Sequence, residues 1–293
     1  MTTKTMPRLH VGVGWQSHGL TLFPVWAEMP VNETLVVNAT DVQVTEMADG
    51  PTVGKLVLTN SGDRPTLLLE GELLEGGWQN RALNADLLLA PHDSQVTDVT
   101  CVEQGRWSGD VRHTRRNRLA PGMVRVGLRR ADGYRQQDVW RRVSHYEPTM
   151  GATGTLSLSD QLDKVSVGRA RRSTIPADPL PGQVGVIGAL SGRPAWLEIF
   201  PSPTALADFW TSIVDAALLD AHSAVNVPCP SQAARDFVVH SGQVPLHAQE
   251  RAGLGTQITG SRRSISVRGI TSSEGDLLHV LAVDVNHPNW VEV

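Results

Sequence analysis

The sequence predicts a β-rich α+β fold, in which an N-terminal antiparallel β-sandwich or barrel-like core precedes a mixed C-terminal half with one long helix. Three observations support this prediction. Short apolar runs separated by Gly, Asn, Asp and Pro fill the first hundred residues, as in strands joined by turns. One long amphipathic stretch begins near residue 203, and strand-like runs return close to the C-terminus.

The N-terminal β-rich part is predicted to span residues 8–107. Its expected strands are residues 20–26, 35–46, 53–59, 66–74, 78–89 and 96–107. Residues 60–65 contain Asn, Gly, Asp and Pro, so they predict a hairpin connection between the third and the fourth of these strands.

An arginine-rich segment, residues 108–135, follows this core. Its apolar residues show weak periodicity, so we expect a long surface excursion. Eleven arginines and three aspartates lie between residues 106 and 142, which gives a local charge of +8. Such a segment can bind phosphate groups or remain a solvated loop, and the sequence leaves both alternatives open.

The mixed C-terminal part is predicted to cover residues 136–293. We expect helices at 139–146, 203–222 and 231–240, and strands at 184–189, 195–200, near 258, at 264–270 and at 277–285. Ser202 suits the N-cap of the long helix and Pro203 its first position. Residues 147–182, rich in Ser, Gly, Pro and Thr, are the best candidate for an internal boundary, but we expect one integrated domain over residues 8–293.

Composition limits the location and the partners of the protein. The two cysteines, Cys101 and Cys229, do not make a disulfide framework. The first fourteen residues lack a long apolar run and no stretch reaches about 18 apolar residues, so neither a signal peptide nor a membrane span is predicted. The net charge of −4 argues against a nucleic-acid partner. We therefore expect a soluble, cytoplasmic protein without a membrane or nucleic-acid partner.

The first candidate site lies at residues 70–81. On a strand over 66–74, Glu70 and Glu72 would share one face, one pleat apart. Two carboxylates that close suit general acid–base catalysis or a hard cation. A turn at Gly76 and Gly77 would bring three more polar residues back beside them: Gln79, Asn80 and Arg81. The alternative is a solvated hairpin whose carboxylates pair with Arg81.

The second candidate site lies at residues 101–107. Cys101 and Glu103 alternate onto one face of the expected strand, with Arg106 on the other. A thiol beside a carboxylate is not activated, because negative charge disfavours the thiolate, so Cys101 is better explained as a small core residue. Glu103 and Arg106 would either form a fixed polar network or contact an anionic ligand.

The sequence assigns neither a metal nor a cofactor. None of the ten histidines forms a pair with helical ligand spacing or has a Cys-x-x-Cys companion, so no metal site is predicted. The chain contains no P-loop and no Gly-x-Ser-x-Gly nucleophile motif.

Four blocks of residues together resemble a known family: 22–26 (LFPVW), 70–81 (EGELLEGGWQNR), 101–107 (CVEQGRW) and 137–140 (QDVW). They are similar to the ARG and Rhodanese-Phosphatase-superfamily-associated protein domain family, a largely β domain family of unknown function. Its name reflects an association with ADP-ribosylglycohydrolases and rhodanese-like phosphatases. The resemblance therefore implies a link to ADP-ribose, NAD-derived nucleotides or phosphorylated metabolites, and it transfers no catalytic residue.

Three hypotheses of function follow, and the sequence leaves open whether the protein is an enzyme. In the first, the protein binds a small anionic ligand of the nucleotide or ADP-ribose type in NAD or ADP-ribose metabolism. Arg81 and Arg106 would hold phosphate there, and Glu70, Glu72, Gln79, Asn80 and Glu103 would complete the site. In the second, it is a hydrolase of an ADP-ribose-type or phosphorylated substrate, with Glu70 or Glu72 as general base, directly or through a divalent cation. In the third, it is a non-catalytic interaction scaffold. No protein partner or oligomeric state is predicted.

Overall fold

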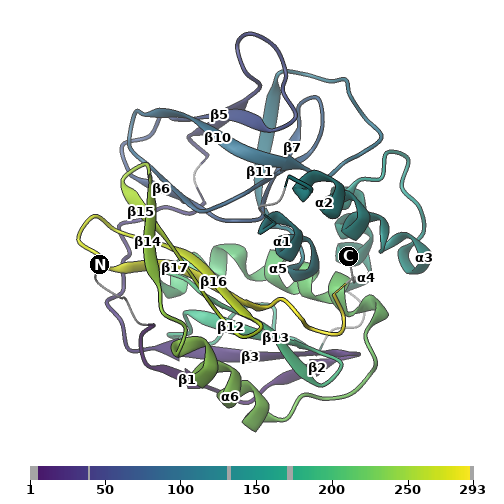
Figure 1. The fold of residues 1–293 in the computed structure, drawn as a ribbon, viewed down its shortest axis with the longest axis vertical. Helices are drawn as coiled ribbons and strands as arrows, with labels where there is room; N and C mark the ends of the chain where they lie inside the picture. The colour runs from purple at the N-terminus through teal and green to yellow at the C-terminus, as the bar shows by residue number, and fades with distance from the viewer. Residues whose placement is uncertain (1–5, 39, 131–132, 170–173, 291–293) are drawn as a thin grey trace.

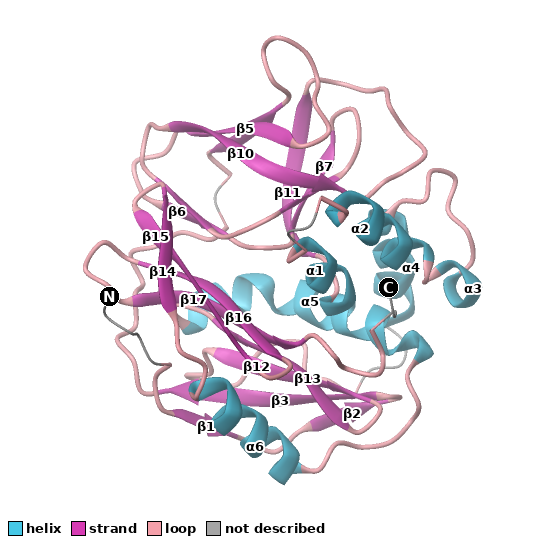
Figure 2. Ribbon diagram, in the orientation of Figure 1, coloured by secondary structure: helices cyan, strands magenta, loops and turns pink. Residues whose placement is uncertain are grey.

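The computed structural model describes residues 6–38, 40–130, 133–169 and 174–290 (Figure 1). Within these residues the strands form a nine-stranded sheet, a closed barrel and a two-stranded ladder. The barrel lies at one end of the molecule and the large sheet at the other, with helices beside and between them (Figure 2). The predicted β-rich α+β class is confirmed, including a barrel-like antiparallel core.

The nine-stranded sheet is antiparallel throughout and combines both ends of the chain. Its order is β1 (Leu9–Val11), β3 (Leu20–Ala27), β12 (Gly185–Leu190), β13 (Arg193–Ile199), β17 (Leu277–Asp284), β16 (Ile265–Thr271), β15 (Gly255–Arg262) and β14 (His247–Ala252), with β2 (Trp15–Ser17) also paired to β3. The prediction that residues 8–107 form one core is therefore wrong for β1, β2 and β3. Strand β3 is apolar on both sides and almost wholly buried, as in a strand covered on both faces.

The barrel is built from residues 42–119. Around its circumference lie β10 (Ser94–Cys101), β5 (Lys55–Asn60), β4 (Val42–Thr45), β11 (Arg112–Leu119), β7 (Glu72–Gly76) and β8 (Arg81–Leu83). Leu56 and Leu58 alternate with half-buried residues along β5, as expected for a barrel wall. The predicted surface excursion at 108–135 is wrong, because it supplies β11 and a buried helix. Strand β11 contains four arginines and has no apolar alternation that would reveal it.

A two-stranded ladder, β6 (Thr66–Leu68) and β9 (Leu87–Leu89), lies off the barrel. The predicted strands 66–74 and 78–89 are wrong as continuous elements, because each divides between this ladder and the barrel. The predicted hairpin at 60–65 is also wrong, since β5 pairs with β4 and β10 while β6 pairs with β9. Glu70 and Gly71 make the turn that breaks the first run, and Gly71 has φ +84° there, which favours glycine.

The helices begin after the barrel. They are α1 (Gly122–Leu128), α2 (Arg135–Ser144), α3 (Glu147–Met150), α4 (Leu158–Arg169), α5 (Pro203–Asp220), the 3-10 turn η1 (Ala221–Ser223) and α6 (Ser231–Gly242). The predictions of α2, α5 and α6 are confirmed. Ser202 caps α5 as expected, because its Oγ accepts a hydrogen bond from Ala205 N at 3.1 Å. Helices α1 and α4 lie in segments for which the sequence predicted no helix.

The large sheet is covered on both faces. Leu22, Val186 and Leu281 belong to the core that includes α5 and the barrel, while Phe23 and Ile187 belong to a second core that includes α6. On the face of the sheet toward the barrel, α5 packs against one part. The other part, near β14 and β15, lies beside the barrel. Among the described residues, no helix has both the length and the apolar character of a membrane span.

Candidate functional site

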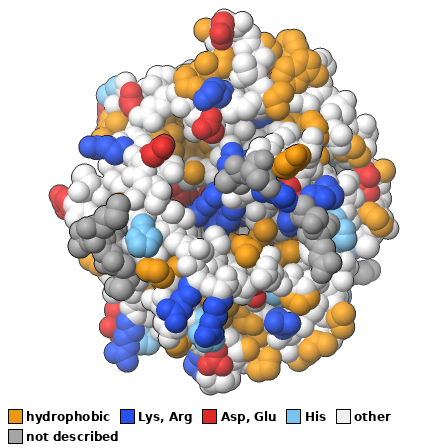
Figure 3. Space-filling model, viewed as in Figure 1, with side chains coloured by type: hydrophobic (Ala, Val, Ile, Leu, Met, Phe, Trp, Pro, Cys, Tyr) orange, Lys and Arg blue, Asp and Glu red, His pale blue; other side chains and the backbone are white. Residues whose placement is uncertain are grey.

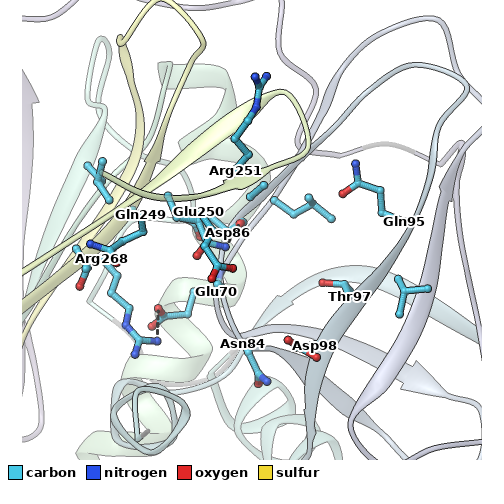
Figure 4. A pocket seen from close by; sticks show the side chains of 18 of the residues that line it. Glu70, Asn84, Asp86, Gln95, Thr97, Asp98, Gln249, Glu250, Arg251 and Arg268 are labelled. Atoms are coloured by element: carbon cyan, nitrogen blue, oxygen red, sulfur yellow. Dashed lines mark hydrogen bonds and ion pairs between the residues drawn. The ribbon is translucent and has the colours of Figure 1, made fainter. Parts of the chain in front are cut away.

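A cleft of about 480 Å³ lies between the barrel and the end of the large sheet. Gln95, Thr97 and Asp98 line it from strand β10, and Gln249 and Arg268 line it from the opposite side (Figure 4). Lys and Arg side chains gather near the middle of the same face of the molecule, between the barrel and the sheet (Figure 3). The volume is within the usual range for small-molecule sites.

The floor of the cleft contains two carboxylates that the β6–β9 ladder places side by side. Glu70 follows β6 and Asp86 precedes β9, and the ladder pairs Leu68 with Leu87. Glu70 N donates a hydrogen bond to Asp86 Oδ1 at 2.7 Å. Both carboxylates therefore stand where the chain passes between the ladder and the barrel.

Glu70 has one oxygen committed and one without a donor. Its side chain is 2% exposed. Arg129 Nε donates to its Oε1 at 2.9 Å, and Arg268 Nη1 lies 3.6 Å from its Oε2 (Figure 4). Among the described residues, no donor makes a hydrogen bond to Oε2. A buried acceptor of this kind on a cleft wall is suited to a ligand hydroxyl.

Asp86 is held by a buried chain of charges. His279 donates from Nδ1 to Asp86 Oδ2 at 2.8 Å and from Nε2 to Glu198 Oε1 at 3.0 Å, and Arg125 Nη2 donates to the same Glu198 oxygen at 2.7 Å. Burial opposes the charge of His279, but its two carboxylate partners outweigh burial and raise its pKa to about 9. Burial is likewise outweighed at Glu198, where Arg125 and His279 lower the pKa to about 2. The imidazole is therefore a doubly protonated cation at neutral pH.

The lining of the cleft contains four carboxylates and three arginines, and its charge balance becomes positive when the cations that pair with three of these carboxylates from outside the lining are counted. Glu70, Asp86 and Asp98 each have a cationic partner outside the lining: Arg129, His279 and Lys55. The remaining charged side chains that line the cleft are Glu250, Arg135, Arg251 and Arg268. Three arginines against one carboxylate leave two positive charges, so the cleft favours an anion.

Glu72, the second carboxylate of the predicted pair, is placed elsewhere. It is fully buried in the barrel wall, where Arg115 Nε donates to its Oε1 at 2.7 Å and Leu69 N donates to its Oε2 at 3.3 Å. Burial raises the pKa of Glu72, against the opposing charge of Arg115. The expected shared strand face is wrong, because the turn at Gly71 separates Glu70 from Glu72.

The structure does bring the other five predicted residues together: Gln79, Asn80, Arg81, Glu103 and Arg106. A turn with positive φ at Gly76 and Gly77 reverses the chain as predicted and pairs β7 with β8. Arg106 donates to both oxygens of Glu103, from Nε at 2.9 Å and from Nη2 at 2.7 Å. Burial would raise the pKa of Glu103, but the hydrogen bonds from Arg106 and other donors outweigh it and lower the pKa.

The contacts of this block are directed at the protein itself. Arg106 Nη1 donates to Gly77 O at 2.6 Å and to Ser108 O at 2.9 Å, which ties two loops together. Arg81 is fully buried beneath the ring of Trp107, with 5.7 Å between the guanidinium carbon and the ring centroid. Cys101 is buried as well, and burial raises the pKa of its thiol, as for a core residue.

Of the seven predicted site residues, Glu70 belongs to the cleft, and the other six lie in the barrel wall and its end loops. Sequence reasoning missed Asp86, Arg129, Glu198, Arg268 and His279. Two of these carried a signal, since Glu198 and His279 are single polar residues inside the apolar runs PAWLEI (194–199) and LLHVLAV (277–283). A charged residue within a buried strand needs a partner and so marks a network. In the described part of the chain, no group of three or more His, Cys, Asp and Glu side chains could hold a metal ion.

Fold and cleft define a β-rich domain with a charged cleft between a barrel and a sheet. The comparison with protein families then identifies it. A model of the ARG and Rhodanese-Phosphatase-superfamily-associated Protein domain matches residues 8–283, and the chain therefore belongs to this family. The comparisons with curated proteins and with solved structures gave no match. The family resemblance predicted from the sequence is thus confirmed over almost the whole chain.

Proposed function

We propose that the protein binds a small anionic ligand of the nucleotide or ADP-ribose type in the cleft between the barrel and the sheet. The surplus of positive charge around a buried acceptor, Glu70 Oε2, carries this proposal. Guanidinium groups suit phosphate oxygens, because their fork of N–H donors matches the geometry of the anion. Arg268 Nη1 lies 3.6 Å from Glu70 Oε2, the oxygen that accepts no hydrogen bond from the described residues, so phosphate and hydroxyl groups of one ligand would be bound side by side.

The polar walls support binding of a sugar hydroxyl. Asn84 Oδ1 accepts from Thr100 Oγ1 at 2.6 Å, which fixes the amide in one orientation. Gln257 Nε2 donates to Asp86 O at 3.2 Å and is fixed in the same way. Side chains that are already oriented lose little entropy when a ligand binds.

The block formed by residues 79–81 and 103–106 was the other predicted ligand site. The buried Arg81 leaves Nε and Nη2 without a hydrogen-bond partner among the described residues, but Arg106 is committed to several protein acceptors, which supports a structural role for the block. We therefore place the ligand in the cleft and treat this block as support for the barrel. Substitution of one arginine in the cleft and of one arginine in the block distinguishes the two candidate sites.

The test measures the thermal shift of the intact protein with ADP-ribose, NAD, AMP and sugar phosphates. A ligand at about 100 times its dissociation constant adds about 2.7 kcal/mol, a shift of a few degrees. Arg268→Gln should abolish the ligand-induced shift, and Arg262→Gln, which changes an exposed arginine of β15, should leave it intact. A shift that survives Arg268→Gln and disappears in a folded Arg81→Lys variant would move the site to the barrel block.

A hydrolase is the second candidate function, and Glu70 Oε2 favours it. An acceptor without a donor can take a proton from water as a general base, provided that a bound substrate presents its scissile bond there. Glu70→Gln preserves shape but removes the base, so turnover of a bound phosphodiester or glycosidic ligand should stop even when the protein is saturated with that ligand. If the parent protein binds the ligand tightly but shows no turnover, the hydrolase function is rejected and the binding function is retained. Absence of any thermal shift across the panel would favour the interaction scaffold.

A further inference from the structure

We infer, resting on the proposed function, that the cleft recognises a phosphorylated sugar through its hydroxyl and phosphate groups and does not require a nucleobase. The cleft has one subsite for hydroxyl groups and one for an anion, and the described residues of its walls include no aromatic ring on which a base could stack.

The hydroxyl subsite is the pair formed by Glu70 and Arg268. Glu70 Oε2 accepts and Arg268 Nη1 donates, and the two atoms are 3.6 Å apart on the cleft wall. Neighbouring hydroxyls of a sugar offer the matching pair, one donating to the carboxylate and the other accepting from the guanidinium. A hydrogen bond to an acceptor as buried as Glu70 Oε2 is strengthened by the low local dielectric constant.

The anion subsite lies where Arg135 and Arg268 face the same cavity. Both line the cleft, from helix α2 and strand β16. Burial lowers the pKa of Arg135, and the charge of Arg268 lowers it further, as expected of two cations that share one low-dielectric space. Arg135 Nε is occupied, since it donates to Arg130 O at 3.0 Å, which leaves the outer guanidinium nitrogens for an anion. A phosphate between the two arginines would relieve their repulsion.

The walls offer no ring on which a base could stack. The described residues that line the cleft are charged, amide or hydroxyl side chains together with glycine and aliphatic residues, and none of them is aromatic; the aliphatic residues are Ala85, Leu87, Val96, Ala252 and Ile258. An aromatic pair, the exposed Trp107 and the half-buried Trp78, lies on the loops at the end of the barrel instead. Base recognition depends largely on stacking, so affinity in this cleft should come from the sugar and its phosphate.

The experiment compares dissociation constants by calorimetry for ribose 5-phosphate, AMP, ADP-ribose, ribose and inorganic phosphate. Ribose 5-phosphate should bind within about tenfold of AMP and ADP-ribose, and at least about tenfold more tightly than ribose or phosphate alone. Glu70→Gln should weaken ribose 5-phosphate by about tenfold or more, which is the usual effect of losing a hydrogen bond to a charged group, and should leave inorganic phosphate unchanged. Arg135→Gln should weaken both, and Arg262→Gln neither.

Two outcomes would overturn the inference and spare the proposed function. One is binding of AMP or ADP-ribose that is about a hundredfold tighter than that of ribose 5-phosphate, which would require base recognition. The other is inorganic phosphate that binds as tightly as the sugar phosphate, which would show that the hydroxyl subsite contributes nothing. Failure of every phosphate ester to bind would reject the proposed function and this inference together.

Discussion

At the scale of single residues, the arginines of the segment 106–142 are mostly partnered inside the molecule. Arg115 pairs with Glu72, Arg125 with Glu198, and Arg129 with Glu70, all with little or no exposed side chain. The local excess of positive charge in the sequence is thus balanced by carboxylates from distant segments. A buried ion pair adds little net stability over an apolar pair, but the loss of one partner is costly because the other charge remains buried.

Glu72 provides the first test of this balance. Glu72→Ala should lower the free energy of unfolding by about 3–5 kcal/mol, because Arg115 would remain buried without its carboxylate. Urea denaturation measures the change, and Glu33→Ala, at an exposed glutamate, is the control. A loss below about 1 kcal/mol would show that Arg115 has another adequate partner.

His279 provides a test in pH. Its pKa is raised from 6.5 to about 9 in the fold, so the folded state binds the proton more tightly than the unfolded state. Protonation of His279 therefore contributes about 3 kcal/mol to the free energy of unfolding. This contribution is fully present below pH 6.5 and is lost as pH rises toward 9. Urea unfolding at several pH values should show this decrease in the parent, and His279→Gln should remove it. An equal decrease in the variant would assign it to other groups.

At the scale of elements, the β14–β15 hairpin touches the β6–β9 ladder through a very close backbone approach. Gly253 has φ +63°, and a Cβ atom there would stand 2.0 Å from Leu88 O. Leu254 N donates to the same carbonyl at 2.8 Å. The hairpin forms the outer wall of the cleft, so this contact sets its width.

Gly253→Ala should therefore destabilise the protein by about 2–4 kcal/mol, through both the unfavourable φ and the clash. Gly54→Ala is a matched control, because a Cβ atom at Gly54 meets no atom within 4 Å. Urea denaturation of both variants measures the difference. Equal stabilities would mean that the hairpin can shift without cost, and the cleft would then be wider in solution.

The elements that could be predicted are those whose local pattern agrees with their environment. Helix α5 has a cap, a first-turn proline and an apolar stripe, and the chain from 185 to 199 forms a hairpin between two apolar strands. Strand β11 could not be predicted, because its arginines are satisfied by glutamates 43 residues away in the sequence. For the same reason, sequence reasoning found only Glu70 among the charged residues of the cleft network. The partners of Glu70 and Asp86 come from the end of α1, from β16 and from β17. Pairing between residues so far apart in the sequence leaves no local pattern.

At the scale of the whole molecule, the barrel and the large sheet are joined by buried charges. Arg129 of the α1 end donates both to Glu70 and to the Ser266 carbonyl of β16, and His279 of β17 binds Asp86 beside the barrel. Separation of the two parts would leave these groups unpaired in a partly apolar surface. This cost supports the prediction of one integrated domain, which stays a prediction.

Cooperative unfolding tests that prediction. Urea midpoints from far-UV circular dichroism and from tryptophan fluorescence should coincide, and they should still coincide when Trp78 and Trp107 of the barrel end are both replaced by Phe. In that variant most of the fluorescence reports on the sheet and on the helices. Two separated midpoints would show that the barrel unfolds independently.

The pairing of β3 with β12 also has a consequence for synthesis on the ribosome. The barrel strands form a continuous stretch, so they can close while translation continues. Strand β3 can pair at once with β1 and β2, but β12 is available only after residues 185–190 have left the exit tunnel. During that interval the apolar residues of β3 lack the rest of the sheet that buries them in the folded protein. We expect this strand to be the segment that a chaperone holds, and slow translation before residue 185 to prolong its exposure.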